Sequence, residues 1–290
     1  MEGFIVGCEP RIQRTRSAIA AFSIALLCSA CASSPDSGWT PIQGALLNPA
    51  QICSEDTNVY GLRTSLIYGK SADIYGIDFG LAGSAQTVVG GQFNVFYNRT
   101  EDFTGIQWGS YNQTEDFTGI QLGDVNRTED FTGIQEGYFY NRAANVMGYQ
   151  RSTFYNSAEN LVGGQFSLFA NRAEDAVGVR LTFVPGNSST NFSGFEASMI
   201  NTVDEQVKGV QLAMVVNEAG ELKGVQLAGI HNKSESVVGL QIASLVNETE
   251  NLRGVQIGAL NFNRNGLIPF FPGINIGFGS SSEEATASDE

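Results

Sequence analysis

Three acidic pairs recur at a spacing of fourteen residues and are the side chains with the clearest chemical potential: Glu101, Asp102, Glu115, Asp116, Glu129 and Asp130. If the repeats that carry them pair as adjacent strands, these carboxylates stack about 4.8 Å apart. Like charges at that distance repel unless a cation, a basic side chain or water separates them. Carboxylate oxygens bind calcium, so the pairs are candidate cation-binding residues. The alternative, a solvated acidic turn, is favoured because the nine-residue Gly-Asp calcium pattern is absent.

Candidates for catalysis are few. His231 is the only histidine, and its repeat phase is held elsewhere by Val216 and Val246, which indicates a structural position. A Ser-His-Asp arrangement or a histidine-containing zinc site has no second candidate. Cys53 has no basic neighbour in the sequence that would favour its thiolate. We therefore expect no catalytic residues, no cofactor and no enzymatic activity.

A repeat that fills most of the chain must position all of these side chains. The pentapeptide Phe-Thr-Gly-Ile-Gln begins at Phe103, Phe117 and Phe131. Its glycine marks a phase that recurs every 14 to 16 residues, at Gly61, Gly76, Gly90, Gly105, Gly119, Gly133, Gly148, Gly163, Gly178, Gly194, Gly209, Gly224, Gly239 and Gly254. Two residues later the side chain is always polar, being Gln in ten repeats and otherwise Arg63, Asp78, Arg180 or Glu196. An asparagine follows the glycine by seven or eight residues in most repeats.

The local pattern predicts an all-β repeat protein. Alternation such as Val-Gly-Val-Gln-Leu-Ala has the period of two that is typical of strands, and no window has sustained helical spacing. Two kinds of architecture fit. Each repeat is either one coil of a β-solenoid of about fourteen 14–16-residue coils, or one strand of an antiparallel β-meander or outer-membrane β-barrel.

Three observations favour the solenoid. Stacked coils place Asn on Asn and Gln on Gln, where side-chain amides form ladders. In a repeat that is one residue shorter, the missing residue falls between the glycine and the asparagine. A coil absorbs this change at a corner. A single strand does not, because a one-residue slip turns all later side chains to the other face. A membrane barrel needs an unbroken apolar face, whereas the phase of Trp108 and Leu122 is continued by Glu136 and Arg151.

The solenoid predicts particular ladders. We expect one structural ladder of asparagines and one of glutamines, represented by Asn217, Asn232, Asn247, Gln211, Gln226 and Gln241. We also expect two aromatic ladders in the core, the first at Phe103, Phe117 and Phe131 and the second at Tyr111, Phe139, Phe154 and Phe169. The alternative for the aromatic residues is an exposed strip that contacts carbohydrate or protein.

The ends of the chain differ from the repeat. Residues 1–31 have basic residues, an apolar run and then Cys28-Ser29-Ala30-Cys31, which is typical of a signal peptide with a lipobox-like end and makes Cys31 the predicted lipidation site. Cleavage by ordinary signal peptidase is the alternative. Residues 32–57 form a tether and the segment that leads into the repeat, residues 58–279 the β-repeat domain with its C-terminal cap, and residues 280–290 an acidic disordered tail.

Charge and cysteine content narrow the partners. The formal net charge of −14 argues against nucleic acid, whose binding requires clustered Lys and Arg. Beyond Cys31 the only cysteine is Cys53, so no intramolecular disulfide is expected if Cys31 carries lipid. The oligomeric state is left open.

The array of Gly-(Val/Ile)-Gln-(Leu/Ile)-(Gly/Ala) units closed by Asn resembles the surface-repeat family of bacterial lipoproteins, of the type found in Leptospira and other Gram-negative lineages. The opening segment from Val59 to Lys70 and the closing Pro-Phe-Phe-Pro-Gly-Ile-Asn are similar to that family too, and the resemblance covers about residues 40–279. It implies an exported, surface-associated protein and no established biochemical activity, so it supplies no catalytic residues.

Two functions are consistent with these observations. The first is a non-enzymatic cell-surface or envelope lipoprotein, held to the outer membrane by lipid, whose repetitive β face has a structural, adhesive or binding role toward envelope or host ligands. The second is an outer-membrane β-barrel pore.

Overall fold

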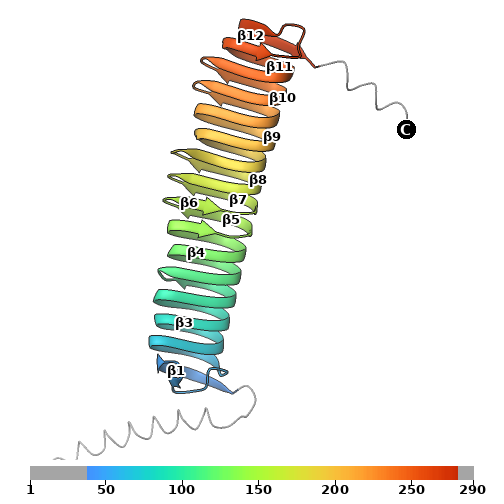
Figure 1. Cartoon of the computed structure of the whole chain (residues 1–290). Helices are drawn as coiled ribbons and strands as arrows, with labels where there is room; N and C mark the ends of the chain where they lie inside the picture. The colour runs from blue at the N-terminus through green and yellow to red at the C-terminus, as the bar shows by residue number, and fades with distance from the viewer. Residues whose placement is uncertain (1–37, 280–290) are drawn as a thin grey trace, which may run out of the picture. The chain divides into compact units, whose positions relative to one another are not determined.

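The computed structural model describes residues 38–279, in which almost every residue is in a β-strand and none is in a helix (Figure 1). The chain is a β-solenoid of about 15 turns, which confirms the predicted fold class. The strands are β1 (Trp39–Leu47), β2 (Ala50–Gln51), β3 (Asn58–Trp108), β4 (Tyr111–Arg142), β5 (Asn145–Ser152), β6 (Tyr155–Ser157), β7 (Asn160–Ser167), β8 (Ala170–Thr182), β9 (Gly186–Ala228), β10 (His231–Ala243), β11 (Val246–Asn263) and β12 (Phe270–Phe278).

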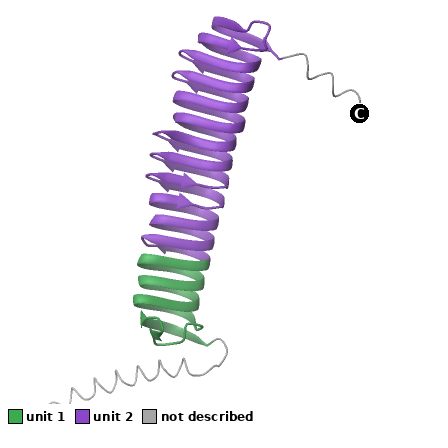
Figure 2. Cartoon of the chain, in the orientation of Figure 1, with its two compact units in different colours: residues 1–101 green, residues 102–290 purple. Residues whose placement is uncertain are grey.

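The solenoid divides into two compact units, residues 1–101 and residues 102–290 (Figure 2). The first unit contains β1, β2 and most of β3, and the second contains the end of β3 and all later strands. The predicted signal peptide, Cys31 and the acidic tail lie outside the described residues. Within residues 38–279 there is no helix with the length and hydropathy of a membrane span.

Successive coils pair as parallel strands in register. In the second unit, β10 pairs with β9 and with β11 so that Gly239 lies between Gly224 and Gly254. The same parallel register joins β5 to β7 and β7 to β8. An antiparallel meander and a closed antiparallel barrel both require neighbouring repeats to run in opposite directions. Those two alternatives are therefore wrong, and the pore hypothesis loses the barrel on which it depended.

Differences in repeat length are absorbed at a corner, as the sequence predicted. The repeat from Gly178 to Gly194 is the longest in the array, yet β8 and β9 keep Gly178 opposite Gly194 and Asn171 opposite Asn187. The additional residue lies between the end of β8 at Thr182 and the start of β9. The buried columns therefore continue through the insertion without a shift of register.

Each coil needs a glycine at the marked phase for two reasons. All fourteen phase glycines have φ between +131° and +148°, a conformation that residues with a Cβ rarely adopt. The backbones also approach closely, because a Cβ added to Gly119 would lie 2.0 Å from the carbonyl oxygen of Gly105. The glycine column is thus a line of direct backbone contact along the stack.

The interior is narrow and unusually polar. Every coil buries one apolar residue two positions before the glycine, such as Phe103 or Leu222, and the polar side chain two positions after it; most coils also bury the asparagine of the repeat. The first predicted aromatic ladder is confirmed, because Phe103, Phe117 and Phe131 are each 2 % exposed and stack with centroid separations of 4.9 Å and 5.4 Å. Polar columns inside an apolar frame require that every amide has a partner.

The two ends of the described chain are closed differently. At the start, β1 pairs in parallel with β3 and antiparallel with β2, so part of the lead-in segment supplies strand structure. At the end, β12 runs antiparallel to β11 and covers the last coil. Terminal turns of a repeat array must differ from internal ones, because one side has no further repeat to pack against.

Candidate functional site

The asparagine column is a continuous hydrogen-bonded ladder in the second unit. Asn217 Nδ2 donates to Asn232 Oδ1 at 2.9 Å, and Asn232 Nδ2 donates to Asn247 Oδ1 at 2.9 Å. The second N–H of Asn232 donates to the backbone carbonyl of Ile242 at 2.8 Å. All three asparagines are 0 % exposed. Each one therefore joins its own corner to the next coil twice, through a side chain and through a main-chain carbonyl.

The glutamine column forms a second ladder with the opposite polarity. Gln226 Nε2 donates to Gln211 Oε1 at 2.6 Å, and Gln241 Nε2 donates to Gln226 Oε1 at 2.8 Å. These donors point toward earlier coils, whereas the asparagine donors point toward later ones. The aligned side-chain dipoles of the two columns thus oppose each other, which limits the net dipole that a long one-directional ladder would accumulate.

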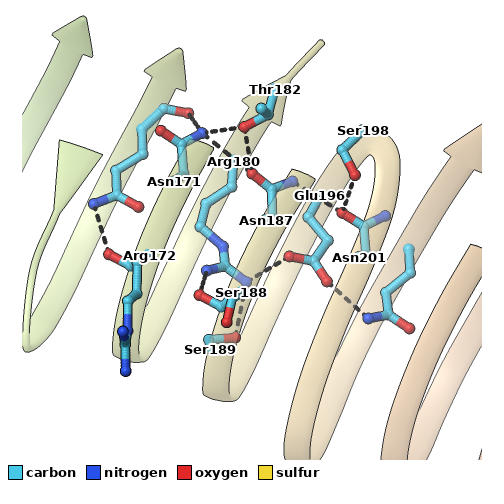
Figure 3. Close-up of polar contacts among 12 residues, drawn as sticks. Asn171, Arg172, Arg180, Thr182, Asn187, Ser188, Ser189, Glu196, Ser198 and Asn201 are labelled. Atoms are coloured by element: carbon cyan, nitrogen blue, oxygen red, sulfur yellow. Dashed lines mark hydrogen bonds and ion pairs between the residues drawn. The ribbon is translucent and has the colours of Figure 1, made fainter. Parts of the chain in front are cut away.

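A buried ion pair interrupts the glutamine ladder in the second unit (Figure 3). Arg180 Nη2 lies 2.5 Å from Glu196 Oε2, and both side chains are 0 % exposed. Gln211 Nε2 donates to the other carboxylate oxygen of Glu196 at 2.7 Å. Arg180 also donates to the backbone carbonyl of Ser188 and to Ser189 Oγ. Glu196 thus accepts the N–H at the end of one glutamine run, and Arg180 neutralises the resulting buried charge.

The environment of Arg180 shows how the pair is held. Its guanidinium carbon lies 4.7 Å from the ring centroid of Phe192. Burial lowers the pKa of Arg180 from its ordinary value, and the charge and hydrogen bond of Glu196 oppose that shift. Within residues 38–279, Gln165 Oε1 and Arg180 Nε are among the buried polar atoms with no hydrogen-bond partner. The preceding glutamine run therefore stops at Gln165.

The first unit contains a corresponding pair. Arg63 Nε and Nη2 donate to the two carboxylate oxygens of Asp78 at 2.7 Å and 2.6 Å. Gln92 Nε2 donates to Asp78 Oδ2 at 3.0 Å, so a carboxylate again accepts the N–H of the glutamine in the following coil. Sequence reasoning noted these four charged variants but did not pair them. The signal was present, because Arg63 and Asp78, like Arg180 and Glu196, are opposite charges one repeat apart at one phase.

The acidic pairs at Glu101 to Asp130 are all exposed. Asp130 Oδ1 accepts a hydrogen bond from Asn145 Nδ2 at 2.6 Å. In the described part of the chain, no three His, Cys, Asp or Glu side chains are grouped so that they could hold a metal ion. Cation binding stays a sequence prediction that the geometry does not strengthen, and exposure agrees with the solvated-turn interpretation.

The remaining candidates occupy structural positions. His231 lies in register between Val216 and Val246, and its Nε2 atom is 3.8 Å from a carboxylate oxygen of Glu248. Cys53 is 3 % exposed and disulfide-bonded, which differs from the expectation of no intramolecular disulfide in a chain that carries lipid on Cys31. The other three cysteines of the chain, Cys31 among them, lie outside the described residues.

The outer surface of the second unit separates charge from apolar side chains. In each coil, the segment from Gly to Asn faces the segment from Asn to the next Gly across the core, as the bond from Thr128 Oγ1 to Gln121 Oε1 shows. In the eleven repeats from Gly105 onward, the Asn-to-Gly segments carry fourteen carboxylates and seven basic side chains. The Gly-to-Asn segments carry only Asp124, Glu136, Arg151 and the buried pair. One side of this unit is therefore acidic and the other almost uncharged.

The uncharged side carries two outward columns, one and three residues after each glycine, which we call the apolar face. Its members are Ile106, Trp108, Ile120, Leu122, Ile134, Glu136, Tyr149, Arg151, Gly164, Phe166, Val179, Leu181, Phe195, Ala197, Val210, Leu212, Val225, Leu227, Leu240, Ile242, Val255 and Ile257. Several are substantially exposed, including Ile134 at 43 % and Val179 at 46 %. Its two charged members form an ion pair at 3.7 Å. The face is therefore a band of mostly β-branched and other apolar side chains, interrupted by the ion pair of Glu136 and Arg151.

An aromatic corner borders the apolar face. Phe139, Phe154 and Phe169 are 49 %, 41 % and 40 % exposed, so the prediction that they form a core ladder is wrong; a contact of this exposed strip with carbohydrate or protein stays a prediction. The corner position lies outside the narrow interior, which the Asn side chains already fill. Phe154 and Phe169 stack at 5.1 Å with an interplanar angle of 4°. Because neighbouring rings cover one another's faces, their edges meet solvent, an arrangement suited to apolar contact rather than to stacking of a sugar on a ring face.

Comparison with protein-family models, with curated proteins and with solved structures finds no match for this chain.

Proposed function

We propose that the chain is an exported, non-enzymatic envelope or cell-surface protein that acts as a structural or binding scaffold through its repeated outer columns. The observation that carries this proposal is the division of the repeat's chemistry. The side-chain amides and the two buried ion pairs satisfy one another inside the coils. The positions that face outward recur in every coil. A regular array of weak contact sites gains affinity through multivalency rather than through one deep pocket.

The proposed location rests on the segment before the repeat and on the resemblance to surface-repeat lipoproteins. Lipid on Cys31 would hold the solenoid at a membrane, where it would meet envelope components or host ligands. The acidic outer side supports a partner other than nucleic acid, since the phosphate backbone is bound by clustered basic residues. Secretion or a periplasmic location without lipid is the alternative for the same leader.

The disulfide of Cys53 makes the proposed lipid anchor on Cys31 testable. A thioether on Cys31 and a disulfide between Cys31 and Cys53 exclude each other, because each uses the same sulfur atom. A lipid-anchored form therefore requires the thiol of Cys31 to be free of Cys53 when lipid is attached. Cys53→Ser should leave lipid attachment unchanged.

The experiment expresses the full chain in a Gram-negative bacterium with labelled palmitate. The proposal predicts label on the wild type and on Cys53→Ser, no label on Cys31→Ser, and degradation of the wild type by protease added to intact cells. Equal labelling of wild type and Cys31→Ser would contradict the anchor. Absence of label, with a mobility shift on reduction that both cysteine variants lose, would indicate an unlipidated, disulfide-bonded form.

A further inference from the structure

We propose that the apolar face of the second unit is a self-association surface, which packs against the same face of a second copy of this chain. This inference concerns residues 102–279 only. It depends neither on export nor on lipid, so it can be tested separately from the proposed function.

Charge distribution is the first argument for a second copy. The formal net charge of −14 makes copies of this chain repel one another over most of their surface. The apolar face is the exception, because its two charged members, Glu136 and Arg151, already form an ion pair with each other. Packing face to face leaves the acidic sides of both copies directed away from the interface. Association through this face therefore buries apolar surface without bringing carboxylates together.

The spacing of the side chains along the apolar face also favours a second copy. The side chains of the face repeat with the separation of parallel strands, about 4.8 Å. A surface with the same spacing interdigitates along its full length, and identical β ladders form dry, tightly packed interfaces for this reason. A second copy meets that requirement automatically. Sheets packed in this way lie about 10 Å apart.

Area is the third argument. The apolar face is about five strand residues wide, or about 16 Å, and eleven coils stacked at about 4.8 Å make it about 50 Å long. The product is roughly 800 Å² on each partner, or about 1,600 Å² in total, which is the standard size of a stable protein–protein interface. Patches of this size are uncommon on monomeric proteins. A two-fold arrangement uses the same patch on both copies and closes the assembly at two chains.

The C-terminal end supports lateral rather than end-to-end association. β12 runs antiparallel to β11, so it does not offer the parallel edge on which another coil would continue the stack. It also contains Pro272, which lacks a backbone N–H for a strand ladder. Lateral contact through the apolar face is therefore the favoured route.

The test is sedimentation of the full-length chain over a concentration series, with matched double variants. Ile134→Lys with Val179→Lys places two cations in the face, at side chains that are 43 % and 46 % exposed. Ile120→Lys with Leu212→Lys changes two other coils, at 37 % and 42 % exposure. Ser188→Lys with Ser236→Lys adds the same charge to the acidic side. All variants carry the same residues 1–37, so differences between them report on the face.

We expect a dimer for the wild type and for the Ser188, Ser236 variant, and dimerisation at least about 100-fold weaker for both face variants, because each leaves unpaired charge in an apolar interface. Unchanged circular dichroism confirms that the variants fold. A wild type that stays monomeric at every concentration would overturn the proposal, and so would a dimer that both face variants retain. A monomer that instead binds neutral phospholipid vesicles, and loses this in the face variants, would assign the face to lipid and overturn self-association.

Discussion

Arg180 and Glu196 form a fully buried ion pair, with Nη2 and Oε2 2.5 Å apart, at a position where the column otherwise holds glutamine. Glu196 Oε1 accepts a hydrogen bond from Gln211 Nε2. The carboxylate therefore stands at the first end of the glutamine ladder that runs through the later coils. The pair therefore replaces an amide link with a charged one without disturbing the register of Gly178 and Gly194.

Removing one partner of this pair should be far more damaging than removing both. Glu196→Gln leaves the Arg180 guanidinium buried without a counter-charge, and we expect a loss of about 3–5 kcal/mol in the free energy of unfolding. Arg180→Gln combined with Glu196→Gln restores the residue type of the neighbouring coils and should lie within about 1 kcal/mol of the wild type. Urea unfolding of the four members of the cycle measures this. A double variant as unstable as Glu196→Gln would contradict the ladder account.

The asparagine ladder predicts a large effect for a substitution that conserves size. Asn232→Leu removes the donor to Ile242 O and both links to its neighbours, leaving buried amide groups unpaired. Each buried group left without a partner costs about 1–3 kcal/mol, so the melting temperature should fall markedly. Asn160→Leu is the matched control, because that asparagine is exposed and makes one ladder bond to Asn145. Equal melting temperatures for the two variants would show that burial of the column does not matter.

The glycine column predicts intolerance of a single methyl group. A Cβ on Gly239 would lie 2.0 Å from the carbonyl oxygen of Gly224, and its φ is +143°. Gly239→Ala should therefore destabilise the second unit by more than the roughly 1 kcal/mol that is typical of a point mutation. Gly38→Ala is the control, since nothing lies within 4 Å of its added Cβ. Thermal unfolding of the two variants compares them, and a neutral Gly239→Ala would contradict the close backbone contact.

Lys233 predicts a pH dependence with a definite sign. Its hydrogen bond to Glu218, at 2.7 Å, and the charge of that residue raise its pKa from the ordinary value of 10.5. A raised lysine pKa in the folded state adds stability that is complete below the unfolded pKa and is lost as the pH rises through the folded one. Because the pair is exposed, its worth is below about 1 kcal/mol. Lys233→Met should thus be slightly less stable near neutral pH and equal to the wild type at strongly alkaline pH, as measured by urea unfolding. A deficit that grows with pH would contradict this sign.

The sequence was sufficient to predict the coil, because its strongest signals are local and repeated. The glycine phase, the amides two residues after it and the asparagine at the corner predicted the parallel stack and the buried ladders around Asn232 and Gln226. The sequence was less informative about the direction of the hydrogen bonds in each ladder and about which repeated side chains face the core. Phe131 and Phe154 are both aromatic residues at a repeated phase, yet one is buried and the other exposed, because the asparagine column fills the interior beside the corner. The opposite polarities of the two ladders depend on which amide atom faces which coil, and residue types do not specify that choice.

Successive repeats are parallel coils in register, and the position of His231 allows this register to be tested. In this structure His231 lies opposite Val246 in the next coil. Val246→His would place two imidazoles on adjacent strands about 4.8 Å apart, close enough to share one Ni²⁺ ion through neutral ring nitrogens. Leu245→His adds the same side chain one residue away, outside that column.

The measurement is the thermal stability of the second unit in the full-length chain, above the histidine pKa, as Ni²⁺ is added. We predict that Val246→His gains about 2.7 kcal/mol when the free ion is 100 times its dissociation constant, while the wild type and Leu245→His gain little. Equal responses of Val246→His and Leu245→His to the ion would contradict the in-register coil.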